Sequence, residues 1–113
     1  MSAAQSSGDV LLVLTNAPDR DTAMTLAHAL IEAKVAACVN VLAACTSVYR
    51  WQGTVENADE VPLFIKTTAA CFDDVQALIR RLHPYELPEI IAVPVARGLP
   101  EYLKWVADET PVL

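Results

Sequence analysis

A histidine followed closely by carboxylates is the first pattern in this sequence that suggests chemistry. His83 precedes a proline, and Tyr85, Glu86 and Glu89 come shortly after it. Imidazole nitrogen and carboxylate oxygen together suit copper, zinc or nickel. The alternative is structural: the ring hydrogen-bonds a nearby carbonyl and stiffens a corner of the chain. A single histidine without obvious partners favours this second interpretation.

The cysteines offer a softer ligand. Cys38, Cys45 and Cys71 are odd in number and show no two-residue spacing, which argues against a disulfide framework or a zinc knuckle. Cys38 follows two alanines at the start of an expected strand, where its thiolate would suit Cu(I). A buried free cysteine usually behaves as a small hydrophobic side chain, and this interpretation is favoured. The candidate metal ligands are therefore His83, Glu86, Glu89 and Cys38.

Aromatic and basic side chains form a second candidate site. One interpretation is a cleft between subunits that holds a small anion, with Lys66 as the single cation in an otherwise apolar run. The other is interface packing, where tryptophan, tyrosine and arginine are common anyway, and packing is favoured. The predicted cleft residues are Lys66, Trp51, Tyr49, Tyr85, Tyr102 and Trp105. The carboxylates of Glu56, Asp59 and Glu60 are interpreted as parts of a solvated turn.

Several function classes are excluded by what the sequence lacks. It has no nucleophile–base pair, no phosphate-cradling glycine loop and no metal-hydrolase spacing, so we expect no enzyme. Its net charge of −6 disfavours nucleic acid and acidic membranes as partners. No apolar run approaches the roughly 18 residues of a membrane span. The opening residues do not resemble a signal peptide, which predicts a cytoplasmic protein with reduced thiols.

The elements that position these residues follow from hydrophobic periodicity. Residues 10–14 are a continuous apolar run and predict a buried strand. An apolar stripe at helical spacing follows over residues 23–33, with Asp19 placed to cap it. A second stripe over residues 72–82 predicts another helix. Residues 89–95 then form a strand whose Pro94 implies an edge position, and Pro100 opens a short last helix.

The longest feature is a ribbon over residues 38–68. Tyr49 and Trp51 alternate with their neighbours at the period of a strand, and Gly53 permits a tight turn. Pro62 in the returning arm predicts a bulge or an unpaired edge, because proline cannot donate to a ladder. Strands this long exceed the usual length of about 5–6 residues. The ribbon must therefore overhang its own domain or pair with another chain.

These elements predict one α+β domain. We expect residues 1–8 to be a disordered tail and residues 9–113 a single domain. The order of strands and helices fits a ferredoxin-like, split βαβ antiparallel sheet with two helices on one face. The long hairpin joins its second and third strands, and a further helix lies at the C-terminus.

Six stretches of the sequence resemble the CutA family of divalent-cation tolerance proteins. They are LVLTNAPD at 12–19, AACVNV at 36–41, SVYRWQG at 47–53, IKTT at 65–68, HPYELPEI at 83–90 and YLKW at 102–105. The resemblance implies a ferredoxin-like subunit in a tight homotrimer whose hairpins pair between subunits. It also implies kinship in architecture with PII-type signalling trimers.

The resemblance also implies a function. It predicts a cytoplasmic homotrimer that binds divalent metal ions, Cu(II) foremost, and contributes to the response to metal ions without a required cofactor. The copper ligands attributed to a bacterial member are a cysteine and two consecutive histidines, and Thr15, Leu82 and His83 occupy those positions here. The alternative is a PII-like sensing trimer that holds a small anion near Lys66 and Trp51.

Overall fold

The computed structural model describes residues 9–112, so the tail predicted for residues 1–8 lies outside the described residues. Within residues 9–112 nine elements follow one another: β1 (Val10–Ala17), α2 (Arg20–Glu32), β2 (Cys38–Val41), β3 (Cys45–Trp51), β4 (Thr54–Thr68), a short 3-10 helix (Ala69–Cys71), α3 (Phe72–Leu82), β5 (Ile91–Pro94) and α4 (Pro100–Asp108). Within this part of the chain no helix is both long enough and apolar enough to span a bilayer.

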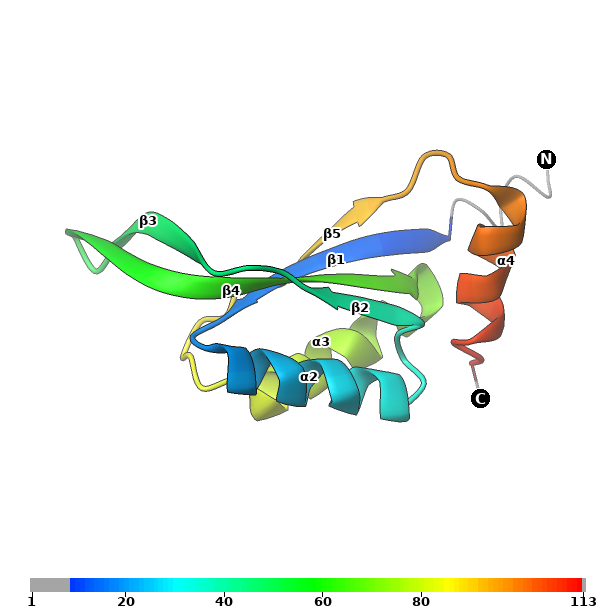
Figure 1. The fold of residues 1–113 in the computed structure, drawn as a ribbon, viewed down its shortest axis with the longest axis horizontal. Coiled ribbons are helices and arrows are strands. Elements are labelled where there is room, and N and C mark those ends of the chain that lie inside the picture. Colours follow the sequence, from blue (N-terminus) through cyan, green and yellow to red (C-terminus); the bar gives the residue numbers. More distant parts are fainter. Residues whose placement is uncertain (1–8, 113) are drawn as a thin grey trace.

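The strands form one antiparallel sheet in the order β2-β4-β1-β5, and β3 continues the pairing along the far half of β4. Helices α2 and α3 lie side by side on one face of this sheet (Figure 1). Helix α2 connects β1 to β2, with β4 between them in the sheet, and α3 connects β4 to β5, with β1 between them. This is the split βαβ arrangement. The predicted α+β class with an antiparallel sheet is confirmed, as is the edge position of Pro94 in β5.

The core lies between the sheet and the two helices. Alternate side chains of β1 and β4 face the helices, because successive residues of a strand point to opposite faces. Burial of each large aliphatic side chain contributes about 1.5–3 kcal/mol. The buried cluster comprises Val13, Ala17, Ala23, Leu26, Ala27, Leu30, Ala36, Val61, Leu63, Ile65, Val75 and Ile79.

Local chemistry sets the ends of α2. The carboxylate of Asp19 accepts a hydrogen bond from the backbone N–H of Thr22 at 2.7 Å, which confirms the predicted cap. After Glu32 the backbone turns left-handed at Lys34, with a φ of 61°. Val35 N–H then donates to the carbonyl of Leu30 at 3.2 Å, the closing bond of a Schellman motif. The helix therefore ends where its apolar stripe ends.

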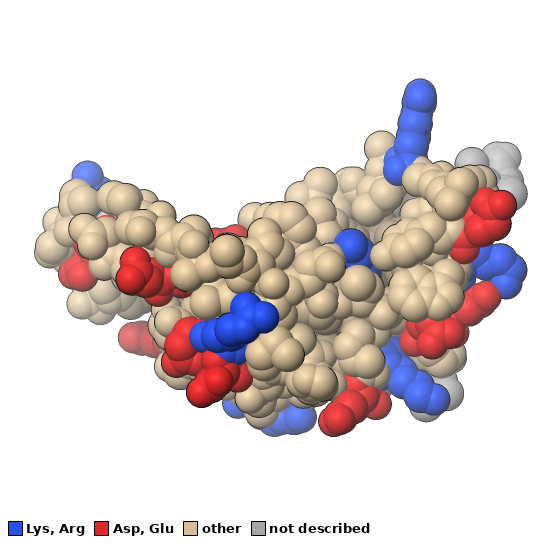
Figure 2. All heavy atoms as spheres, viewed as in Figure 1, with Lys and Arg blue, Asp and Glu red and all other residues tan. Residues whose placement is uncertain are grey.

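The opposite face of the sheet carries no helix among the described residues except α4, which covers one end of it over Val10 (Figure 1). Strand register places Leu12, Leu14 and Phe64 on this face beside Ile91 and Val93. Ile91 is 52% exposed and Val93 49% exposed. Much of the middle of the molecule, between the charged helices and the end near α4, is uncharged at the surface (Figure 2). We call the face of the sheet opposite α2 and α3, with Leu12, Leu14, Phe64, Ile91 and Val93, the open face.

The ribbon projects beyond the sheet and gives the molecule its length of 48 Å, against 25 and 23 Å in the other directions (Figure 1). Its first arm is not one strand, as the sequence suggested, but two, β2 and β3, because residues 42–44 interrupt it. Val41 pairs with Leu63 and Cys45 with Glu60. Three residues of the first arm therefore oppose two of β4, which is a bulge.

Pro62 lies opposite this bulge. Its carbonyl accepts a hydrogen bond from Leu42 N–H at 2.9 Å, so the side of Pro62 that lacks an N–H faces the interruption. The other edge of the same residue pairs with Asn16 of β1. The predicted bulge is confirmed, whereas Pro62 itself lies inside the sheet rather than at an outer edge.

The bulge decides which way the aromatic residues of the ribbon point. Before it, Cys38 pairs with Lys66 on the open face, and even-numbered residues face that way. After it, Tyr49 pairs with Glu56 and Trp51 with Thr54, so odd-numbered residues do. At the tip, Gln52 and Gly53 have φ values of 50° and 83°. These values fit a type I′ turn and confirm the turn predicted at Gly53.

Candidate functional site

His83 occupies the corner between α3 and the loop 84–90. Its backbone is extended before Pro84, as predicted, and its side chain is only 7% exposed. Nε2 lies 2.6 Å from the carbonyl oxygen of Asn16, and the N–H of Tyr85 donates to Nδ1 at 3.1 Å. Because Nδ1 accepts, the proton is on Nε2 and donates to Asn16. The neutral ring is thus fully hydrogen-bonded, as in the structural interpretation.

Asn16 links this histidine to one of the predicted carboxylates. Its side-chain amide donates to Oε1 of Glu89 at 3.1 Å, while its backbone carbonyl accepts from His83. Glu86 and Glu89 are both exposed in the loop 84–90. Asn16 of β1 thus fixes the position of His83 relative to the loop 84–90.

The predicted metal ligands are not gathered into one site. Cys38 lies on the open face, where its sulfur is 4.0 Å from Nζ of Lys66. In residues 9–112 no three His, Cys, Asp or Glu side chains come close enough to hold a metal ion. A protein metal site ordinarily needs at least three such ligands. Metal binding through His83, Glu86, Glu89 and Cys38 therefore stays a prediction, and one subunit does not supply a complete set.

A cleft of about 890 Å³ opens between the ribbon and the loop 84–90. This volume falls in the range of small-molecule sites, roughly 300–1,000 Å³. Three of the predicted cleft residues line it, namely Tyr49, Trp51 and Tyr85. Its other lining residues are Asn16, Ser47, Val48, Glu60, Pro84, Glu86, Leu87, Pro88, Glu89, Ile90 and Ile91.

The other three predicted cleft residues lie elsewhere. Lys66 is on the open face, and its Nζ donates to Oδ1 of Asn40 at 2.7 Å. Tyr102 and Trp105 pack together on α4, with ring centroids 5.5 Å apart, at the end of the molecule opposite the ribbon (Figure 1). The sequence therefore combined two groups of aromatic residues that the fold separates. Lys66 and Trp51 are not brought together within one subunit, so an anion held near both in a cleft between subunits stays a prediction.

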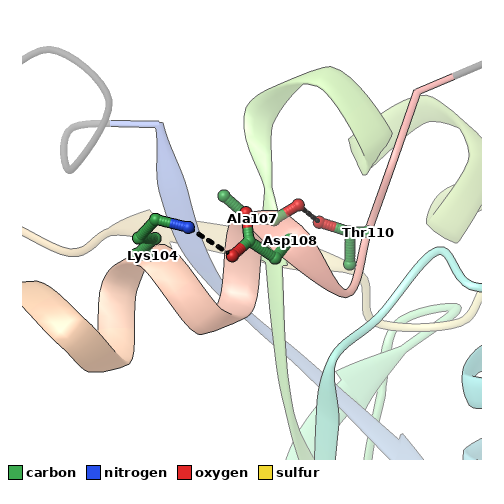
Figure 3. Close-up of polar contacts among 4 residues, drawn as sticks. All are labelled: Lys104, Ala107, Asp108 and Thr110. Carbon is green, nitrogen blue, oxygen red and sulfur yellow. Dashed lines mark hydrogen bonds and ion pairs between the residues drawn. The ribbon is translucent and has the colours of Figure 1, made fainter.

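Helix α4 is anchored as a structural element. Thr110 Oγ1 donates to the carbonyl of Val106 at 2.9 Å. It also lies 3.4 Å from the carbonyl oxygen of Ala107 (Figure 3). Lys104 forms an exposed ion pair with Asp108 at 2.7 Å, which contributes little at the surface (Figure 3). The buried thiol of Cys71 donates to the carbonyl of Thr110 at 3.6 Å. Cys71 is therefore a packing residue, as expected.

Glu60 is the residue that sequence reasoning missed. It was interpreted as part of a solvated turn, and this is wrong, because the residue is only 8% exposed and lines the cleft. The alternation of β4 would have placed it on the same side as Pro62 and Phe64, which was the available signal. The loop 84–90, which covers Glu60, comes from a distant part of the sequence. No sequence pattern indicated that it would lie against Glu60.

The cleft is electrically negative. Burial, then a hydrogen bond to the Glu60 carboxylate and the negative charge of that group, raise the pKa of Tyr85 to about 12. Glu60, Glu86 and Glu89 all line the cleft, and its lining as described contains no lysine, arginine or histidine. The site is therefore able to receive a positive charge and would repel an anion.

Comparison with known proteins gives a consistent result. The family model described as CutA1 divalent ion tolerance protein matches residues 11–109. A divalent-cation tolerance protein CutA from Thermus thermophilus is 44% identical over 99 residues, which are 88% of this chain and 96% of the relative. A Xenopus laevis CutA homolog is 41% identical over 105 residues, covering 93% of this chain and 70% of the longer relative.

Solved structures agree with the sequence matches. The Thermus thermophilus divalent cation tolerance protein superposes with a TM-score of 0.89 at 43% identity, covering 90% of this chain and 99% of that one. CutA from Xylella fastidiosa gives the same TM-score and identity, with coverages of 91% and 99%. The α+β antiparallel architecture is thus shared with known structures. An Archaeoglobus fulgidus protein of this kind is called periplasmic and an Arabidopsis thaliana one chloroplastic, so similar proteins are assigned to different compartments.

Proposed function

The chain belongs to the CutA1 divalent ion tolerance family, and from this membership we propose that it is a cytoplasmic homotrimer that binds divalent metal ions, copper foremost. The observation that carries the proposal is the family match across residues 11–109. We propose a binding role in the response to metal ions rather than catalysis.

The trimer is supported by two surfaces that a single chain leaves uncovered. One is the open face, with Leu12, Leu14 and Phe64 in its middle. The other is the far half of the ribbon, where the outer edges of both strands have no partner among the described residues. Unpaired strand edges and exposed apolar surface are each satisfied when subunits associate.

The proposed ligands are His83, Glu86, Glu89 and Cys38. His83 and Glu89 are held close to one another through Asn16, and imidazole with carboxylate suits copper. A metal at the His83 ring would have to replace the hydrogen bond to Asn16 or to Tyr85. Because one subunit offers fewer than three gathered ligands, the proposal ties metal binding to the assembled trimer.

Native mass spectrometry with added Cu(II), and then Zn(II), tests this function. We expect a trimer that takes up metal and loses most of it in Glu89→Gln, a variant that keeps an oxygen to accept from Asn16. His28→Ala is the matched control, since His28 is exposed on α2 and far from the proposed ligands in the sequence. A trimer that stays metal-free would refute metal binding and leave the architecture standing.

A further inference from the structure

The cleft between the ribbon and the loop 84–90 has a chemistry that the proposed metal ligands do not explain. We propose that it binds an organic cation, a compound whose guanidinium or primary ammonium group lies against Glu60 and the ring of Tyr85, with Tyr49 and Trp51 farther out along the cleft. The proposal goes beyond metal tolerance and does not depend on it.

Glu60 supplies the first argument. The residue as a whole is only 8% exposed and lines the cleft, and the described part of the chain gives it no lysine or arginine partner. Its one neighbour of note is the hydroxyl of Tyr85, which has a single proton to donate. A carboxylate accepts several hydrogen bonds, and one on a largely buried residue gains from a positive partner. A cationic ligand with several N–H donors would meet this need.

The aromatic lining supplies the second argument. Tyr49, Trp51 and Tyr85 come from two parts of the chain, β3 and the loop 84–90, and line the same cleft, with Trp51 at its outer end beside the tip of the ribbon. Aromatic rings attract cations, tryptophan most strongly. A guanidinium group both stacks on rings and donates two parallel hydrogen bonds to a carboxylate, so it suits this combination particularly well.

The remaining lining residues indicate that the cation is organic. Leu87, Pro88, Ile90 and Ile91 form an apolar wall that would pack against an alkyl chain, and a bare metal ion would leave this wall unused. Glu86 and Glu89 at the exposed rim offer a second negative group to the far end of an extended ligand. A small dication with an apolar spacer therefore suits the chemistry of this lining.

Agmatine, which has a guanidinium group, a butyl spacer and an ammonium group, is the probe for this inference. The assembled full-length protein with Trp105→Phe leaves Trp51 as its one tryptophan, so fluorescence reports the cleft. We expect saturable agmatine binding in fluorescence and in calorimetry. N-butylurea, which is similar in shape but uncharged, should not bind.

Variants locate the binding. Glu60→Gln should weaken agmatine binding at least about tenfold, because a neutral amide replaces the buried charge. The matched control Glu101→Gln removes a negative charge from α4, at the end of the molecule far from the ribbon, and should leave the affinity unchanged. Tyr49→Leu provides a second test that leaves Glu60 in place and should also weaken binding. Equal affinity in Glu60→Gln and in the control, or no saturable binding of agmatine, would overturn the proposal.

The ligand in the cell can be a free amine or an arginine side chain of a partner protein. Blocked arginine, N-acetyl-arginine amide, distinguishes these sources when its affinity is compared with that of agmatine. Metal titration of Glu60→Gln separates this inference from the proposed function. If agmatine fails while copper binds, the inference alone falls; if agmatine binds while the trimer stays metal-free, metal binding falls.

Discussion

At the scale of single residues, the role of His83 depends on a partner far away in the chain. Its identity as a candidate was visible in the sequence, where it stands before Pro84 with carboxylates following. Its actual partner is the carbonyl of Asn16, which lies 67 residues earlier and carries no side-chain signal. Local sequence therefore predicted which residue matters but not what it contacts.

His83→Ala should destabilise the protein in metal-free buffer. The change leaves the Asn16 carbonyl and the Tyr85 N–H without their partner, and an unsatisfied buried polar group costs about 1–3 kcal/mol. Urea unfolding measures the difference in the free energy of unfolding. His28→Ala, at an exposed position, should change it by less than about 0.5 kcal/mol. Equal stabilities would show that the ring has no structural role and would favour it as a free ligand.

Tyr85 gives a prediction in the alkaline range. The folded protein holds the phenolic proton more tightly than the unfolded chain does, since the pKa rises from 10.0 to about 12. The contribution of Tyr85 to stability is therefore complete below pH 10 and is lost as the pH rises toward 12. Ultraviolet titration of phenolate should lose a step near pH 12 in Tyr85→Phe. In Glu60→Gln the same step should move to lower pH; an unmoved step would remove Glu60 as a cause.

Glu60 marks the limit of sequence reasoning at this scale. Together with Glu56 and Asp59 it looked like part of a polar turn, and those two neighbours are indeed exposed. What distinguishes Glu60 is the loop 84–90 lying across the cleft, a contact between segments more than twenty residues apart. Neither amino-acid composition nor hydrophobic periodicity indicates such a contact.

At the scale of elements, the sequence predicted those that depend on local chemistry. The cap at Asp19, the turn at Gly53 and the edge at Pro94 each follow from one residue type and were confirmed. The break at residues 42–44 was not placed, because these residues, Leu42, Ala43 and Ala44, contain no glycine or proline. Only Pro62, on the opposite strand, indicated it.

Gly98 leads to a prediction about the docking of α4. A Cβ added at this position would lie 2.8 Å from Cδ2 of Leu103 and 3.0 Å from its Cγ. Leu103 is buried against Val10 and Val106, so it has little room to move. Gly98→Ala should lower the free energy of unfolding by about 1–3 kcal/mol, the usual cost of overpacking.

The double variant Gly98→Ala with Leu103→Val tests the cause. Because valine is shorter than leucine, Leu103→Val should be less harmful in the Gly98→Ala background than in the native protein. Thermal unfolding of the four proteins gives the coupling between the two positions. Strictly additive effects would mean that Gly98 matters through its backbone rather than through Leu103.

At the scale of the whole molecule, the ribbon is separate from the core. None of the buried hydrophobic residues of the two clusters comes from the far half of the ribbon, residues 45–59. That half must therefore be explained by something other than the stability of the subunit, and we infer that it serves assembly. The number of subunits comes from the family resemblance and is still to be measured.

A shortened ribbon tests this inference. Cys45 and Glu60 are paired across the ribbon just as Trp51 and Thr54 are, so the turn Gln52–Gly53 can be transplanted between them. The resulting protein should keep its sheet and helices, seen as native-like circular dichroism with cooperative unfolding. Light scattering should then show loss of the oligomer. A shortened protein that still assembles fully would assign assembly to the open face alone.

The bulge opposite Pro62 has a consequence for how the chain can change in length. Three residues of the first arm face two of β4 at this point. Inserting or deleting a single residue among 42–44 would therefore turn every side chain beyond it on the first arm to the opposite face of the ribbon. Val48 and Arg50 would then take the places of Tyr49 and Trp51 at the cleft. Matched insertions on both arms beside the tip would only lengthen the ribbon. Length differences among natural relatives should therefore cluster at the tip and occur in even numbers. The segment that corresponds to residues 42–44 should have three residues in all of them.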